Sequence, residues 1–138
     1  MGIFDKARRN SRADVGAGHP IASPALVELA SESWRFHQVM QRSIASMDPF
    51  DAQRLENHYT WYQRIVQNVL DEAGLHVVDL TGERYDVGMA VTPLNLEDFP
   101  EDARSSYYIA QMVEPIVMQD GSVMKHGTAM LGEELEAK

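Results

Sequence analysis

Residues 48–80, DPFDAQRLENHYTWYQRIVQNVLDEAGLHVVDL, contain the change of pattern that decides the fold. Before Gly74, the apolar residues recur every three or four positions, as on one face of an α-helix. These residues are Ala52, Leu55, Tyr59, Tyr62, Val66, Val69 and Ala73. Gly74 stands where helices commonly end in a left-handed residue. From His76 to Leu80 the period falls to two, so the sequence predicts a helix followed directly by a strand.

Upstream, another helix is predicted by a repeated start signal. Ser23-Pro24 and Asp48-Pro49 each place a capping side chain before a proline at the first helical position. Between them, apolar residues again keep a helical spacing at Leu26, Leu29, Phe36, Met40 and Met47. Because proline disfavours the helical region for the residue before it, the first helix, over about 25–47, ends at Asp48.

After residue 74 the pattern predicts a small β domain over 75–132. Strands are expected at 76–80, at 84–91 with a break near Gly88, at 107–118 with an interruption at Pro115, and at 122–131. Asp120-Gly121 is a hairpin turn signal, and residues 93–106 are acidic and turn-rich. The predicted class is α+β: an N-terminal antiparallel helical hairpin over 23–74 followed by a small antiparallel β domain.

Two terminal segments, residues 1–22 and 133–138, are predicted to be a flexible tail and an acidic tail. The first contains the one basic cluster of the chain: Lys6, Arg8, Arg9 and Arg12. This cluster either binds an anionic surface, with Ile3 and Phe4 as its apolar edge, or is solvated. The solvated tail is the favoured interpretation.

The predicted helices carry more apolar surface than one hairpin can bury. Trp61, Ile65 and Leu70 form a second line on helix 49–73, and Trp34 lies off the main line of the first helix. Either the β domain covers these faces, or two hairpins form a homodimeric four-helix bundle. The dimer is favoured, and its expected interface consists of Leu55, Tyr59, Tyr62, Val66 and Val69.

The composition is typical of a soluble, acidic chain of about one domain. With 138 residues and a net charge of −9, the chain lacks the clustered cations that nucleic-acid binding needs. It has no cysteine and no apolar run long enough to span a membrane. Its first residues match neither a secretion signal nor a myristoylation pattern. We therefore expect a cytoplasmic protein.

Motifs that carry chemistry are not found in the sequence. The glycines do not have phosphate-binding spacing, no two histidines are four residues apart, and the paired carboxylates at 97–102 lie in a solvated loop. Tyr59, Trp61 and Tyr62 could form a ligand-stacking cluster, but Tyr59 and Tyr62 have the spacing that is typical of helix packing. We expect a protein that is not an enzyme and that needs no cofactor or metal.

Three stretches, in order, carry a family resemblance. They are Val69 to Leu75, Gly82-Glu83-Arg84-Tyr85-Asp86 with Ala90-Val91, and Asp120 to Leu131. They resemble the helix end, the Gly-x-x-Phe-Asp-Pro…His-x-Ala segment and the closing hairpin of the GrpE family, the nucleotide exchange factors of Hsp70 chaperones. The resemblance covers roughly residues 55–131.

This resemblance implies a homodimer whose β domain binds the nucleotide-binding domain of an Hsp70-like chaperone and opens its cleft, so that ADP leaves. Such a protein makes no bond and acts by binding the open cleft more tightly than the closed one. Carried over by position, the partner-binding residues are Met89, Ala90, Val91, Ser122, Lys125 and Leu131.

The chain departs from the family pattern in three places. Val87 follows Asp86 where the family has proline, Ser122 replaces the hairpin arginine, and Pro49 interrupts the long N-terminal helix. The alternative function is therefore a non-catalytic adaptor or structural subunit that uses a GrpE-like fold for dimerisation and docking. A small-molecule enzyme is a third class, for which the sequence offers no residue constellation.

Overall fold

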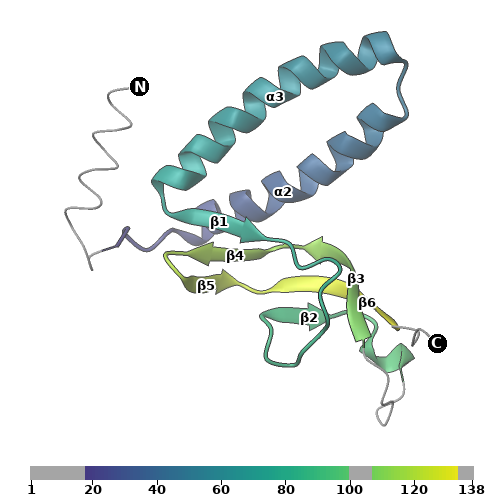
Figure 1. Ribbon diagram of the computed structural model, residues 1–138. Coiled ribbons are helices and arrows are strands. Elements are labelled where there is room, and N and C mark those ends of the chain that lie inside the picture. Colours follow the sequence, from purple (N-terminus) through teal and green to yellow (C-terminus); the bar gives the residue numbers. More distant parts are fainter. Residues whose placement is uncertain (1–17, 100–106, 134–138) are drawn as a thin grey trace.

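The computed structural model describes residues 18–99 and 107–133, and it confirms the α+β class (Figure 1). Two helices, α2 (Pro24–Ala45) and α3 (Pro49–Glu72), precede the strands. Figure 1 shows them running in opposite directions, with the turn that joins them lying away from the sheets. Both predicted helices are confirmed, with ends within about two residues of those expected.

Local hydrogen bonds explain where the helices begin. The Ser23 hydroxyl accepts a bond from the backbone N–H of Leu26 at 3.2 Å. The Asp48 carboxylate accepts bonds from the backbone N–H groups of Phe50 and Asp51 at 3.1 and 3.4 Å. Each cap satisfies N–H groups that have no partner within the helix. Since these signals act over a few residues, they can be read directly from the sequence.

The strands form two three-stranded sheets. The first has the order β1-β4-β5 and consists of β1 (Leu75–Val78), β4 (Ile116–Gln119) and β5 (Ser122–Lys125). The second has the order β2-β6-β3 and consists of β2 (Val91–Pro93), β6 (Gly127–Glu133) and β3 (Tyr107–Glu114). The predicted final strand thus extends to Glu133, the first residue of the expected acidic tail.

One strand pair contradicts the prediction of an antiparallel β domain. β2 pairs with β6 in parallel, whereas the other three pairs are antiparallel. After β2 the chain continues in the same direction, and the backbone N–H of Leu94 donates to the carbonyl of Ala129 at 2.9 Å. The side chain of Asn95 then donates to, and accepts from, the backbone of Leu131. These partners lie far along the sequence, so no local pattern could predict the pairing.

The predicted strands over 84–91 are mostly absent from this described region. Arg84 forms only an isolated bridge with Tyr108. The segment that follows turns at Asp86, whose carboxylate accepts a bond from Gly88 N–H at 3.2 Å and whose carbonyl accepts one from Met89 N–H. A short 3-10 helix, η1 (Leu96–Asp98), lies in the acidic loop. From residue 100 on, the acidic, turn-rich segment expected over 93–106 lies outside the described residues.

The closing hairpin is one ribbon that bends from one sheet into the other. Its two strands are divided at Pro115 and at His126, so that β3 pairs with β6 and β4 with β5. At the bend, a Cβ on Gly127 would come within 2.8 Å of the Glu114 carbonyl oxygen, so glycine permits the close approach. Asp120 and Gly121 have φ angles of 47° and 85°, as a two-residue hairpin turn requires.

Two apolar cores hold the molecule together. The first core lies against the sheet of β2, β6 and β3, and Trp34 of α2 packs on it. Its buried residues are Val91, Ile109, Met112, Ile116, Ala129 and Leu131. The second lies between the base of the helix pair and the first sheet; its buried residues are Val27, Ala30, Leu70, Leu75 and Val117. The β domain therefore covers α2 from its start to about Trp34 and the last turns of α3.

Candidate functional site

The tip of the β4–β5 hairpin is an exposed and well-defined surface. Ser122, which the resemblance assigns to partner binding, is exposed at the start of β5. Its neighbour Val123 is 43% exposed. The preceding residue, Gly121, and Asp120 fix the turn through their positive φ angles. The tip thus presents a polar and an apolar side chain on a backbone of defined shape. We call residues 120–123 the β-tip.

Lys125, also assigned to partner binding, is held by carboxylates of its own chain. Its ammonium group lies 2.9 Å from Glu28 of α2 and 3.3 Å from Glu114 of β3. The hydrogen bond to Glu28 is the largest cause of its raised pKa, which partial burial opposes. Lys125 therefore joins α2 to the β domain in this structure, and a partner would have to replace these contacts.

The other assigned residues split between core and surface. The side chains of Val91 and Leu131 are 5% and 4% exposed, so they belong to the first core and do not form an exposed surface. Met89 and Ala90 are half-buried against the same core. The resemblance assigns positions along the chain but not the orientation of each side chain, which the long-range pairing of β2 and β6 sets.

Two exposed residues near these positions are not among those that the resemblance assigns to partner binding. Met130 is 37% exposed and Leu94 is 50% exposed. Along β6, Ala129 and Leu131 are buried while Met130 between them is exposed, as the alternation of a strand requires. This alternation was visible in the sequence, but the inward face could not be chosen without knowing which strands pair.

The helix pair carries a large exposed apolar surface. Phe36 of α2 lies edge-on to Tyr59 of α3, with ring centroids 6.1 Å apart, and Tyr59 lies 6.3 Å from Tyr62. The rings therefore continue from one helix to the other. Large side chains at helical spacing extend this surface along both helices, each between 45% and 50% exposed: Leu29, Phe36, Tyr62, Ile65 and Val69. We call these five residues the helix-pair face.

The interface residues predicted for a dimer differ in how far they are exposed. Tyr59 is only 8% exposed and packs against Phe36 and His37 of its own chain. Leu55 and Val66 are half-buried, and Val66 packs against the second core. Tyr62 and Val69, at 50% and 47%, are exposed. The predicted stripe therefore contains residues that pack within the chain together with residues that face outward.

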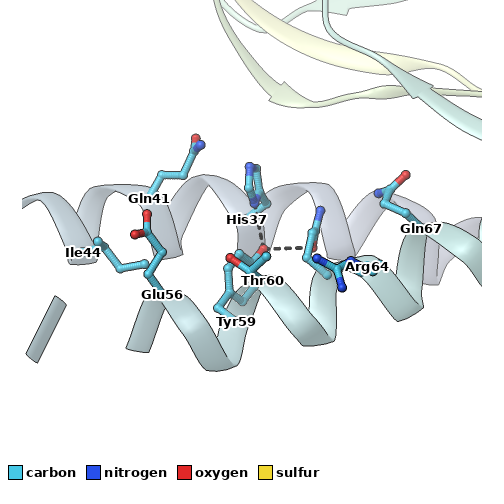
Figure 2. Close-up of a pocket in the computed structure, with 9 residues that line it drawn as sticks. His37, Gln41, Ile44, Glu56, Tyr59, Thr60, Arg64 and Gln67 are labelled. Atoms are coloured by element: carbon cyan, nitrogen blue, oxygen red, sulfur yellow. Dashed lines mark hydrogen bonds between the residues drawn. The ribbon is translucent and has the colours of Figure 1, made fainter. Parts of the chain in front are cut away.

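A cavity of about 370 Å³ lies between α2 and α3 (Figure 2). His37 Nδ1 lies 2.9 Å from the Tyr59 hydroxyl, which itself donates to Gln63 Oε1 at 3.1 Å. Because that hydroxyl has one proton, Nδ1 is the donor in the first bond. Burial raises the pKa of Tyr59. Other polar side chains around the opening are Gln41, Glu56, Thr60, Arg64 and Gln67.

This bond chain joins the helices in the middle of the pair. It contains no ionised nucleophile and no carboxylate bonded to the histidine, which an activated triad needs. Among residues 18–99 and 107–133, no group of three or more His, Asp or Glu side chains could hold a metal ion. In the same ranges, neither helix has the length and apolar character to cross a membrane.

Comparison of the chain with protein-family models, with curated proteins and with solved structures gave no match.

Proposed function

We propose that this chain is a non-catalytic, GrpE-like co-chaperone that promotes nucleotide exchange on an Hsp70-like partner. The β domain binds the partner's nucleotide-binding domain, and the helix pair joins two copies as a homodimer. The observation that carries the docking role is the large apolar surface left exposed on α2 and α3. The partner class rests on the resemblance of residues 55–131 to the GrpE family.

The helix-pair face has a suitable size for covering by a second copy. Aromatic side chains such as Phe36 and Tyr62 bury about 150–250 Å² each, and the three aliphatic side chains bury somewhat less. At about half exposure, five of them supply roughly 450 Å², about half of the ~800 Å² per partner of a standard interface. Polar side chains between and around them can supply the remainder. Isologous contact of this face with its copy forms a four-helix bundle.

At the β domain, the proposal assigns partner contact to exposed side chains. Ser122 and Val123 project at the β-tip, and Met130 takes the place of the buried Leu131. Binding to an open nucleotide-binding cleft shifts the partner toward that state only by the difference between the affinities for open and closed forms. A β-tip whose backbone shape is already fixed favours binding to the partner, because little conformational entropy is lost when the complex forms.

The decisive experiment follows the release of a fluorescent ADP analogue from an Hsp70-like chaperone of the same source. We expect the wild-type chain to accelerate release several-fold. Ser122→Asp should weaken this effect by about tenfold or more, because it places an unpaired charge in the contact. Asn68→Asp makes the same charge change at an exposed position on α3 and should have no effect. Release that wild-type protein leaves unchanged would contradict the exchange function.

The adaptor function makes a different prediction in the same experiment. An adaptor or structural subunit binds its partner through the same surfaces but leaves the nucleotide-release rate unchanged. Stable association measured by light scattering, together with unaltered release, would therefore support the adaptor. The exposed helix-pair face is compatible with the adaptor as well, because both functions need dimerisation and docking.

A further inference from the structure

The turn between β4 and β5 holds the segment that leads into α2. Gln119 at the end of β4 is only 5% exposed. Its Oε1 accepts a hydrogen bond from Ala22 N–H at 3.0 Å, and its Nε2 donates to the carbonyls of Pro20 at 2.8 Å and Ala73 at 2.9 Å. Toward Pro20 and Ala22, this amide makes the pair of bonds that a neighbouring strand would make to an extended backbone.

Asp120, the next residue, also binds this segment. Its Oδ2 accepts a bond from the backbone N–H of His19 at 2.8 Å, and its Oδ1 lies 2.8 Å from His19 Nδ1. Gly74 forms the adjacent wall, because a Cβ there would collide with His19 Nδ1 and lie 2.6 Å from Asp120 Oδ1. Gly74, Gln119 and Asp120 thus match an extended segment that contains His-Pro.

The segment is attached by a few side-chain hydrogen bonds and by the packing of Ala22 against the second core, and not by a strand ladder. Residues 18–22 belong to no helix or strand. Their polar contacts run to the side chains of Gln119 and Asp120, and Ile21 is 85% exposed. Leaving the site therefore breaks no strand ladder. It does leave the buried Gln119 amide without two of its three partners, which is unfavourable and promotes rebinding of a peptide backbone.

We propose that Gly74, Gln119 and Asp120 form a peptide-binding site that residues 18–22 fill as a releasable strap. Once the strap is released, the site binds an extended His-Pro segment of another chain. Recognition uses a carboxylate for the N–H groups of histidine and a primary amide for the backbone around proline. The site shares Asp120 with the β-tip but does not depend on the exchange function, because its ligand is defined by these contacts alone.

Hydrogen exchange on the full-length, ¹⁵N-labelled protein tests whether the strap is releasable. We expect the Ala22 amide to exchange at least about tenfold faster than that of Val117 in the central strand, and at a rate that low urea does not change. Gln119→Leu should accelerate Ala22 exchange by a further tenfold or so. Ser122→Ala, next to the turn but outside the strap contacts, should leave it unaltered. Ala22 exchange that follows global unfolding would overturn the proposal.

A peptide added to the full-length chain tests the binding site itself. The probe is residues 16–24, GAGHPIASP, acetylated and amidated, and the control has alanine in place of His and Pro. In His19→Ala/Ala22→Pro, which weakens the strap, the probe should shift the Gln119 side-chain amide signals with a millimolar Kd. Binding to wild type should be about tenfold weaker, because the tethered strap competes.

Two outcomes would refute the peptide site. One is the absence of a saturable shift in the strap variant, and the other is an equal shift with the control peptide. If the strap variant fails to fold, the Ala22 exchange rate in the wild-type chain still decides whether the strap opens. Neither measurement involves a chaperone or nucleotide, so this proposal and the exchange function can fail separately.

Discussion

Gly74 is required by its backbone angle and by its neighbours, and these two requirements can be separated. Its φ is 73°, and a Cβ would collide with His19. Gly82 has a φ of 91° but no atom within 4 Å of an added Cβ. Gly82→Ala should therefore cost about 1–2 kcal/mol for the left-handed backbone alone, and Gly74→Ala should cost at least ~1 kcal/mol more. Urea unfolding measures both losses, and equal values would show that the collision is harmless.

The contact between Asp120 and the strap makes the stability of the protein depend on pH. The hydrogen bond from the His19 backbone N–H is the largest cause of its lowered pKa, followed by the bond from the His19 ring; His76 also acts on it. Because the folded-state pKa lies below the unfolded value of about 3.9, the contribution to stability is present above that pH and is lost as the pH falls through the folded pKa.

Asp120→Asn removes this titration while keeping a favourable turn residue. The difference in unfolding free energy between wild type and variant should keep its full value above about pH 5 and should shrink as the pH falls toward about 3. Urea unfolding at several pH values measures it. A difference that stays constant over this range would contradict the assigned role of the carboxylate.

At the scale of elements, Lys125 joins α2 to the β domain through Glu28. The Glu28 side chain is 55% exposed, so solvent screens the pair and its coupling energy should be only about 0.5 kcal/mol at low salt. A double-mutant cycle of Lys125→Met and Glu28→Gln measures this coupling, which should fall as salt is added. The exposed pair Arg35–Glu32, within α2, is the matched control. A coupling of zero would mean that α2 is held by apolar packing alone.

The elements also show which parts of the fold the sequence can predict. The helices were predicted nearly to the residue because Ser23, Asp48 and Gly74 act through bonds to groups a few residues away. The parallel pairing of β2 with β6 depends on contacts such as Leu94 with Ala129, which are distant in sequence. Strand composition does not record which partner lies alongside, so this pairing was not predictable.

For the candidate site, the sequence offers segments only, and their role in partner binding stays a prediction. The resemblance selected the β4–β5 hairpin and the residues around β2, and both contain exposed side chains. It could not separate buried Leu131 from exposed Met130, because a shift of one residue reverses the face of a strand. The strap was missed because Gln119 is a polar residue whose partners, Pro20 and Ala22, come from a segment predicted to be a tail.

For the whole molecule, the helix-pair face predicts self-association. Ile65→Lys places a charge on this face and should convert a dimer to a monomer at tens of micromolar, as measured by light scattering with size exclusion. Thr60→Lys makes a comparable change one turn away, at the cavity between the helices, and should leave the dimer intact. A wild-type chain that is monomeric at this concentration would contradict the prediction.

The bent ribbon over 107–133 has a consequence for how the β domain comes apart. Because β3 continues into β4 through Pro115, and β5 into β6 through His126, each sheet takes strands from the same hairpin. A change of strand register in one sheet therefore requires a change in the other sheet. We therefore expect the β domain to melt as a single cooperative unit, so that damage at one end of the ribbon lowers the order of both sheets together.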